Sequence, residues 1–403
     1  MTQEAVLIAA LSGRGLAASA RRAGYLPLVA DAFGDSDTQE HALALCRVED
    51  AARIGLRTRQ LFAALATLEA RVAHAPTGLV LGSGFEDRPK LVRALSRRYR
   101  IVGNGADAIA RCKDPAALDT VLRAHAIPFP DTVSERPSDP AGWLQKRIGG
   151  SGGGHITQAG AGERSARCYY QRRLDGTPVS VLVLARGHRH APQLIGFSRQ
   201  WPVGTGPRPY RYGGAVGPDA PDAPAAAGAM HKAADDLCRV LGLVGLVSLD
   251  FLLVDGIPHL LEVNPRPGAT LDIFDDADGA LFRAHVAVSL NPDATPPLPA
   301  PDGTIRAAAI LYADRGRLAA APASWPDWTA DRPAPGSRVP RYRPIATVLA
   351  SGATAHAAFA SCRHRLDELS EMLYAQAPNR ERNDDAEVQR PGPERISARS
   401  QAR

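Results

Sequence analysis

Over the first hundred residues, short aliphatic runs alternate with longer amphipathic segments. The short runs are bounded by glycine, proline or charged residues, which is typical of strands buried on both faces. The longer segments repeat apolar residues every three or four positions, which indicates helices. This alternation predicts an α/β domain with a parallel sheet. The expected strands are 5–10, 26–31, 78–82 and 100–103, and the expected helices are 16–23, 60–73 and 89–98.

Beyond residue 105 the pattern changes to helices mixed with paired strands. From residue 377 almost no apolar residues remain, while arginines and acids accumulate, a composition that predicts a disordered tail. Between these limits we expect helices at 115–125, 227–241, 275–290 and 355–374, a strand ending at residue 146, a strand pair within 168–183, and strands at 304–312 and 345–350.

The most informative stretch is 242–268, GLVGLVSLDFLLVDGIPHLLEVNPRPG. Its two apolar runs flank an Asp-Gly pair, which is a hairpin turn signal. Asp250, Glu262 and Asn264 interrupt these runs; the last two are two positions apart, so both point to one face of a strand, and the hairpin can bring Asp250 beside them. Two carboxylates and an amide oxygen are ligands of the kind that Mg²⁺ prefers. Arg266 adds a planar fork suited to phosphate or carboxylate. The alternative for any one of these residues is a buried acid–arginine cluster that only holds the hairpin together.

A second informative stretch is 143–157, WLQKRIGGSGGGHIT. A strand ending at Lys146 leads into a glycine-rich loop, 149–154, whose backbone N–H groups could approach a phosphate closely. Lys146 can add a point charge to that phosphate. The loop is not followed by Gly-Lys-Ser/Thr, so it is not a P-loop. A flexible linker is the alternative interpretation.

Together the two stretches resemble the ATP-grasp superfamily, whose metal-binding segment consists of an acid, a hairpin and Glu-x-Asn-x-Arg. The resemblance implies an α/β protein with the ATP-grasp fold: an N-terminal Rossmann-like α/β domain, a small α+β lid and a C-terminal α+β domain. It also implies ATP and Mg²⁺, or Mn²⁺, as cofactors, with Asp250, Glu262 and Asn264 as the metal ligands. The implied divisions are an N-terminal domain at 1–105, a linker helix and lid at 106–170, the C-terminal ATP-grasp domain at 171–300, a small C-terminal subdomain at 301–376, and the tail at 377–403.

The same resemblance implies the nucleotide contacts. Lys113 stands beside an acid before a helix, as in the family but in reversed order, and a solvated lysine is the alternative. The carbonyl of Arg172 and the N–H of Leu174 would bind the adenine edge, and Asp175 would reach the ribose. Gln171 stands where the family often has glutamate, and Arg147 where it usually has proline. The implied nucleotide-binding set is Lys113, Lys146, Gly150, Ser151, Gly152, Gly153, Gln171, Arg172, Leu174 and Asp175, with Arg266 and Lys146 as catalytic residues.

The implied reaction activates a carboxylate as an acylphosphate, joins it to an amine and releases ADP and phosphate. Arg211, which lies among tyrosines, is a candidate clamp for a substrate carboxylate. The C-terminal segment DRPAPG…RPIATVLASG looks most like ATP-dependent carboligases related to biotin carboxylase, of the kind associated with methanofuran and tetrahydromethanopterin synthesis. The implied partners are therefore ATP, a small carboxylate and an amine, and a homodimer is left open.

Composition narrows the kinds of partner and the cellular compartment that we expect for the protein. The net charge of +6 suits an anionic nucleotide, while no basic run is interleaved with aromatic residues, so we expect no nucleic-acid partner. No apolar run reaches the length needed to cross a membrane, so we expect no membrane partner. The five scattered cysteines contain no CxxC and fit a reducing cytoplasm.

Three other functions stay open from the sequence. A biotin-carboxylase-like enzyme would activate bicarbonate. An NAD-dependent oxidoreductase would use the Gly13-x-Gly15 loop and Asp31, which resemble a dinucleotide fingerprint. A non-catalytic nucleotide-binding module would bind ATP without turnover.

Overall fold

The computed structural model describes residues 3–160, 167–205 and 208–375. The tail expected from residue 377 lies outside these ranges, and its disorder stays a prediction. Within the described ranges, no helix combines the length and the apolar character needed to cross a bilayer.

The N-terminal part is a parallel five-stranded sheet in the order β3-β2-β1-β4-β5. Four of its strands were expected from the aliphatic runs. The short β3, ALCR, was missed because its residues are only partly buried and form no clear apolar run. The strands are β1 (Ala5–Ala9), β2 (Leu26–Asp31), β3 (Ala44–Arg47), β4 (Leu79–Leu81) and β5 (Ile101–Val102).

Helices cover both faces of this sheet. Val6 and Ile8 point to the face packed against α1 and α10, whereas Leu7 and Ala9 point to the face packed against α4 and α5. Because successive residues of a strand point to opposite faces, a strand buried on both sides must be apolar throughout. These helices are α1 (Arg14–Arg22), α4 (Thr58–Glu69), α5 (Pro89–Ser96) and α10 (Ala280–Leu290).

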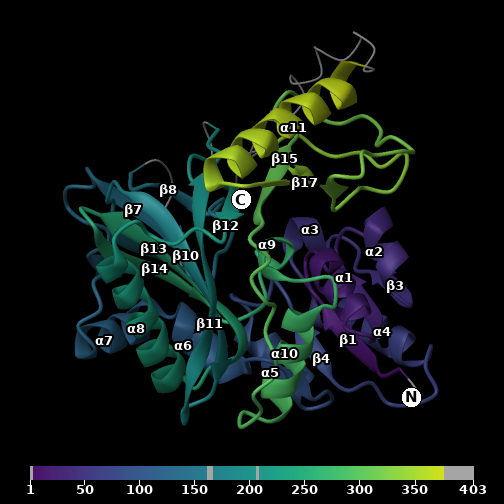
Figure 1. Ribbon diagram of the computed structural model, residues 1–403, viewed down its shortest axis with the longest axis horizontal. Coiled ribbons are helices and arrows are strands. Elements are labelled where there is room, and N and C mark those ends of the chain that lie inside the picture. Colours follow the sequence, from purple (N-terminus) through teal and green to yellow (C-terminus); the bar gives the residue numbers. More distant parts are fainter. Residues whose placement is uncertain (1–2, 161–166, 206–207, 376–403) are drawn as a thin grey trace, which may run out of the picture.

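An antiparallel eight-stranded sheet, in the order β14-β13-β10-β11-β12-β15-β17-β16, forms the long middle of the molecule. Helix α8 (Pro224–Leu241) packs on β10 and β13, and α11 (Ala355–Ala375) packs on β15 and β17 (Figure 1). The strands expected at the two ends of this region therefore belong to one continuous sheet. They are β10 (Thr177–Arg186), β11 (His190–Pro202), β12 (Tyr212–Gly217), β13 (Val244–Val254), β14 (Ile257–Asn264), β15 (Ile305–Tyr312), β16 (Thr329–Ala330) and β17 (Pro344–Gly352).

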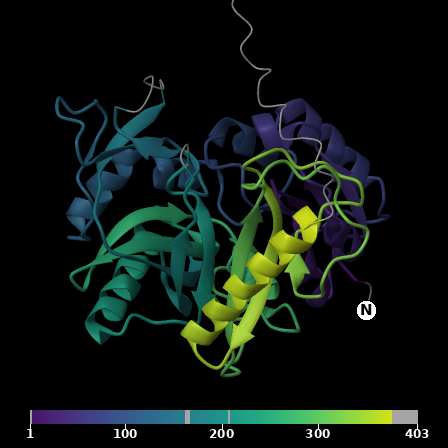
Figure 2. The same ribbon diagram turned by 90° about the horizontal axis from the view of Figure 1, so that it is seen from above.

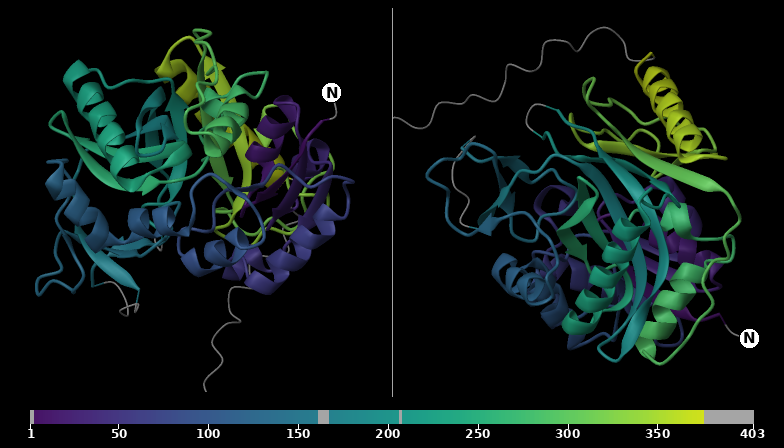
Figure 3. Two further views of the ribbon diagram at one scale, coloured as in Figure 1. Left: turned by 90° about the horizontal axis from the view of Figure 1, so that it is seen from below. Right: turned by 60° about the vertical axis from the view of Figure 1, so that its left-hand side comes forward.

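A third, four-stranded sheet in the order β6-β9-β7-β8 carries the glycine-rich loop. Figures 1 and 2 show this small sheet and the N-terminal domain toward opposite ends of the molecule, with both above the long sheet in Figure 2, and Figure 3 shows the same arrangement from two further directions. Its strands are β6 (Thr132–Val133), β7 (Trp143–Arg147), β8 (Ile156–Gln158) and β9 (Cys168–Arg172); the remaining helices are α2 (Ser36–His41), α3 (Ala51–Ile54), α6 (Ala106–Lys113), α7 (Pro115–Ala124) and α9 (Leu271–Phe274).

Candidate active site

A cavity of about 1270 Å³ is lined by residues from all three sheets. On the N-terminal side it reaches Ser12 and Ser83, which follow the carboxyl ends of β1 and β4. The strand order reverses between these two strands, and open α/β sheets bind ligands at such a point. The opposite wall is formed by the hairpin β13–β14 and the glycine-rich loop.

The hairpin brings the three expected oxygen-bearing side chains together. Its two turn residues both have positive φ, +50° and +80°, as a tight Asp-Gly turn requires. The turn pairs Phe251 with Leu260, and a one-residue bulge at Leu261 then places Asp250 directly opposite Glu262. The Asn264 amide donates a hydrogen bond to Asp250 Oδ2 at 2.8 Å. The expectation that these three residues share one place on the hairpin is confirmed.

The two carboxylates are electrostatically unequal. Burial raises the pKa of Asp250, and the Glu262 carboxylate raises it further. Burial also acts to raise the pKa of Glu262, but the Lys113 ammonium outweighs it and holds that pKa below its ordinary value. Among the described residues, no three His, Cys, Asp or Glu side chains gather closely enough to hold a metal. A metal ion on this hairpin would therefore need the amide oxygen of Asn264 as well as the two acids.

Lys113 lies at the end of α6 and reaches into this cluster. Its ammonium contacts the Glu262 carboxylate and donates to Asn264 Oδ1 at 3.1 Å. Asp114 instead caps α7, accepting from the N–H groups of Ala116 and Ala117 at 3.0 and 3.2 Å. In this Lys-Asp order, Lys113 at the end of α6 contacts the hairpin, while Asp114 caps the start of α7. Lys113 is buried, so the alternative of a solvated lysine is wrong.

Lys146 lies on β7 and is also buried. It donates to Gln171 Oε1 at 2.6 Å, while the Gln171 amide donates to Thr132 Oγ1 at 3.2 Å. Burial lowers the pKa of Lys146 to about 8, with Lys113 lowering it and Glu262 raising it. The glutamine therefore orients the lysine without adding a charge.

The glycine-rich loop packs against the long sheet, so it is not a free linker. The Tyr212 N–H donates to the Gly152 carbonyl at 3.0 Å. A Cβ on Gly153 would lie 1.8 Å from the Tyr210 carbonyl oxygen, so only glycine fits there. Gly152 faces open space, but its φ of +69° disfavours any residue with a side chain.

The segment 171–175 lines the same cavity. The N–H of Leu174 donates no hydrogen bond to any residue that the structure describes. The Asp175 side chain is 85% exposed and pairs with Arg173 at 2.8 Å. The adenine and ribose contacts expected from Arg172, Leu174 and Asp175 stay predictions.

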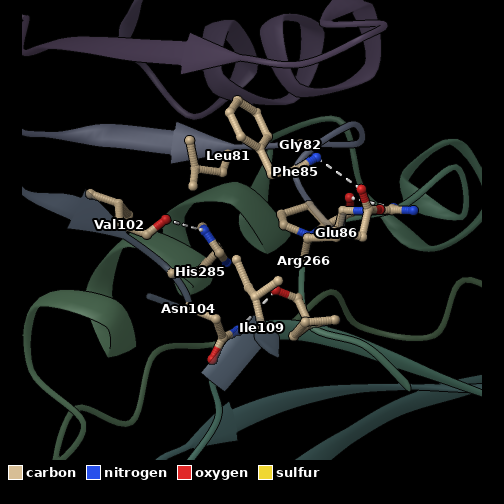
Figure 4. Close-up of a pocket in the computed structure, with 12 residues that line it drawn as sticks. Leu81, Gly82, Phe85, Glu86, Val102, Asn104, Ile109, Arg266 and His285 are labelled. Carbon is tan, nitrogen blue, oxygen red and sulfur yellow. Dashed lines mark hydrogen bonds and ion pairs between the residues drawn. The ribbon is translucent and has the colours of Figure 1, made fainter. Parts of the chain in front are cut away.

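Arg266 follows β14 and is held by an acid that the sequence did not single out (Figure 4). Its Nε donates to Glu86 Oε1, whereas Glu86 Oε2 accepts from the N–H groups of Gly84 and Phe85 at 2.8 and 2.9 Å. Burial acts to raise the pKa of Glu86, but Arg266 and Lys113 outweigh it and lower the pKa to about 2. Glu86 and Arg266 are 180 positions apart, so no local spacing could have linked them.

We expect Glu86→Gln to lower the free energy of unfolding by about 3 kcal/mol at pH 7, because a pKa lowered from 4.5 to about 2 corresponds to 1.36 kcal/mol per unit. A lowered carboxyl pKa stabilises the fold above the unfolded pKa. That contribution disappears as the pH falls toward 2, so the free energies of unfolding of the variant and the wild type should approach each other at that pH. Urea unfolding at pH 7 and pH 3 measures this difference. Glu69→Gln, at a partly exposed pair with Arg98, is the control; a loss from Glu86→Gln that is equal at both pH values would contradict the prediction.

Comparison with known families matches residues 112–270 to the family described as ATP-grasp domain. This part of the chain is an ATP-grasp domain. Three similar solved structures are a biotin carboxylase from Campylobacter jejuni (13% identity, 91% of each chain covered, TM-score 0.68), N5-carboxyaminoimidazole synthetase from Staphylococcus aureus with ADP (13%, 91% of this chain and 98% of that one, 0.62), and the biotin carboxylase domain dimer of the Hydrogenobacter thermophilus 2-oxoglutarate carboxylase with MgADP and bicarbonate (11%, 91% and 90%, 0.68).

At these identities the likeness shows the fold, and the predicted α/β ATP-grasp fold is confirmed. No curated protein matches the chain in sequence.

Within the ATP-grasp domain, the structure corrects the interpretation of Arg211. Its guanidinium pairs with both Asp314 oxygens at 3.0 and 2.6 Å and stacks 3.6 Å from the centre of the Tyr312 ring. The residue is only 3% exposed and does not line the cavity. Arg211 therefore holds β12 to the C-terminal part of the sheet and is not free to clamp a substrate carboxylate.

Two residues that face the ATP-grasp domain's cavity were missed. His155 follows the glycine run, and burial is the main cause that lowers its pKa to about 4. Its place directly after the loop was a signal that could have found it. Gln200 lies on β11 and donates to Asp250 Oδ1 at 3.1 Å. Only the pairing of distant strands could have revealed this contact.

The Gly13-x-Gly15 loop is occupied by the protein itself. Ser12 Oγ donates to Asp331 at 2.9 Å, and Arg14 bonds both Asp272 and Asp331. Asp31 is wholly buried, and its two oxygens accept from Gly13 and Gly34 N–H groups at 3.2 and 2.8 Å. The acid that a dinucleotide-binding unit would offer to a ribose is thus engaged by backbone, which disfavours the oxidoreductase alternative.

Proposed function

We propose that the protein is an ATP-dependent, ADP-forming ligase that activates a carboxylate as an acylphosphate and joins it to an amine. The observation that supports this most strongly is the hairpin cluster of Asp250, Glu262 and Asn264, which faces Lys113 and Lys146 beside a glycine-rich loop. Phosphoryl transfer needs charge neutralisation and positioning more than a covalent protein nucleophile. The cluster offers both.

The donor set fits Mg²⁺, or Mn²⁺ as an alternative. Asp250 and Glu262 lie opposite each other. Burial raises the pKa of Asp250 and the Glu262 carboxylate raises it further, and a divalent cation would offset both effects. Asn264 would complete the set. A bound Mg²⁺ supplies positive charge to the phosphate oxygens during transfer. Lys113, relieved of its ion pair with Glu262, would then turn its ammonium to a phosphate.

The nucleotide would lie between the glycine loop and segment 171–175. Lys146 would reach a phosphate, and the N–H groups of Ser151, Gly152 and Gly153 would surround it. The Gly150 N–H, which was expected in this set, instead donates to the Arg147 carbonyl at 3.0 Å. The Leu174 N–H and the Arg172 carbonyl would bind the adenine edge, with Asp175 at the ribose. The glycine loop and the small sheet that carries it would keep water from the acylphosphate.

The chemistry then runs in two displacements. A carboxylate oxygen attacks the γ-phosphorus of ATP and ADP leaves. The neutral amine nitrogen then attacks the acyl carbon, phosphate leaves, and the departing phosphate accepts the proton that the amine loses. Arg266 would contact the transferring phosphate, held in orientation by Glu86. Two further hypotheses are that the protein is located in the cytoplasm and that it acts in one-carbon cofactor synthesis. The second follows from the resemblance of the C-terminal segment to carboligases of that kind.

A matrix of carboxylates and amines, assayed for ADP release, tests this function. The expected result is turnover that requires one member of each class. A second candidate function is supported by the likeness to biotin carboxylases, one of them with bicarbonate bound. ADP release stimulated by bicarbonate with no amine present would favour that candidate. Tight ATP binding without turnover across the whole matrix would favour a non-catalytic module.

We expect Lys146→Ala to weaken ATP binding on the order of ten- to a hundredfold, because a charge-assisted contact to phosphate contributes about 1.5–3 kcal/mol. The ammonium loses its proton as the pH rises through the pKa of about 8, so wild-type ATP affinity should fall above that pH, and the variant's should not. Titration calorimetry at pH 7 and pH 9 measures both effects.

Gly152→Val is the companion variant, since it strains the loop without changing its charge. It should also lower ATP affinity, and ATP should protect the loop from limited proteolysis less than in the wild type. Lys232→Ala, at an exposed pair on α8, is the control. If both loop variants bind ATP like the wild type, the nucleotide lies elsewhere.

A further inference from the structure

One acid in the large cavity is buried without a partner. Asp35 precedes α2 beyond the end of β2, is 5% exposed and lines the cavity. Although it holds the position of a helix cap, its carboxylate accepts no capping bond, and no hydrogen bond or ion pair joins it to any residue that the structure describes. A buried carboxylate normally has a partner because its desolvation is costly.

The acids around Asp35 have all been satisfied by other groups. Asp31 accepts two backbone N–H groups. Asp37 accepts from the backbone N–H groups of Asp331 and Arg332 at 2.8 and 3.0 Å. Asp331 itself bonds Ser12, Arg14 and Thr347. Arg14, whose charge acts to lower the pKa of Asp35, is thereby committed to Asp272 and Asp331.

This arrangement leaves Asp35 in a field of negative charge. Burial is the first cause that raises the pKa of Asp35, to about 8, and the carboxylates of Asp331, Asp31 and Asp37 raise it further against Arg14. Exposed arginines also line this cavity, among them Arg47 and Arg338, and Arg47 lies against Gly34, directly before Asp35. Within the part of the chain that the structure describes, neither arginine forms an ion pair with Asp35, so the carboxylate still lacks a cation.

We propose that Asp35 binds the primary ammonium group of the second substrate, in the recess formed by the loops after β1 and β2 and the segment that begins at Asp331. This rests on the proposed ligase function, because it assigns the amine that the acylphosphate would acylate. An ammonium carries the one charge and the three donors that an isolated carboxylate can neutralise and share. A hydroxyl of the same size carries no charge to offset the buried acid.

The test compares matched ligands by titration calorimetry at pH 9, above the pKa of about 8 of Asp35 and below that of an alkyl ammonium, so that both partners are charged. ATP is left out, so that binding is measured apart from turnover. The probes are β-alanine against 3-hydroxypropionate and propylamine against propan-1-ol, which differ only in amine or hydroxyl. The proteins are the wild type, Asp35→Asn, and Glu40→Gln as the control. Glu40 is an exposed acid of α2 that does not line the cavity, so its variant removes the same charge from the same element.

The wild type and Glu40→Gln should bind each amine at least about tenfold more tightly than its hydroxyl analogue, and Asp35→Asn should lose that preference. Asp35→Asn should also melt at a higher temperature, because a carboxyl pKa raised from 3.8 to about 8 destabilises the fold increasingly as the pH rises between those values. A merely structural Asp35 would instead give a lower melting temperature.

An amine preference that survives in Asp35→Asn, or that is missing in the wild type, overturns the assignment. So does an absence of any amine binding. These outcomes differ from a failure of the ligase function alone. If only the ligase function is wrong, the amines still bind through Asp35, but no pair of carboxylate and amine releases ADP.

Discussion

Glu262→Gln is expected to abolish ADP formation, with kcat lower by on the order of 10²–10³-fold, the scale of losing one preorganised electrostatic group at a reacting centre. Glu262 is the carboxylate with the lowered pKa in the hairpin, lies directly opposite Asp250 and contacts Lys113. Glutamine keeps its shape and one oxygen but removes the charge that would hold a divalent cation. Coupled-enzyme detection of ADP over a range of Mg²⁺ concentrations measures the loss.

The variant must also be shown to fold. Lys113 keeps its bond to Asn264, so we expect a stability loss of about 1–3 kcal/mol, which circular dichroism during thermal unfolding would resolve. Glu371→Gln, at an exposed pair on α11, is the matched control and should leave both activity and melting unchanged. Near-normal turnover of Glu262→Gln at saturating Mg²⁺ would remove the metal assignment.

Arg266→Lys is expected to lower kcat about a hundredfold or more while ATP affinity stays within a few-fold of wild type. Lysine keeps the positive charge beside Glu86, so the fold retains the buried pair, but it loses the planar fork that can bond Glu86 and a phosphate together. Separate measurement of kcat by ADP release and of ATP affinity by calorimetry distinguishes a lost transition-state contact from lost binding.

Glu86→Gln provides the partner measurement at Arg266. If Glu86 only orients the guanidinium, that variant should reduce kcat less than Arg266→Lys does, and the double variant should lose little more than Arg266→Lys alone. Additive losses would show that the two side chains act independently. Wild-type kcat in Arg266→Lys would exclude the arginine from the reaction.

The sequence by itself determined the secondary structure and the chemistry of the hairpin. An Asp-Gly turn between two apolar runs sets the register of β13 and β14 next to the turn. A one-residue bulge at Leu261, which no sequence pattern predicted, then places Asp250 opposite Glu262. In the same way, unbroken aliphatic runs required a sheet covered on both faces. These are local properties, because neighbours in the chain decide them.

Only the tertiary structure decided which charges meet across the chain. The sequence shows no partner for Arg211, but in the structure its guanidinium pairs with Asp314, about a hundred positions later. In the same way, Arg266 pairs with Glu86. Asp35 carried no motif at all; its character comes from acids that β2, α2 and the segment at Asp331 bring around it. The physical reason is that a side chain's partners, burial and pKa depend on contacts between segments far apart in sequence, and a linear pattern does not contain those contacts.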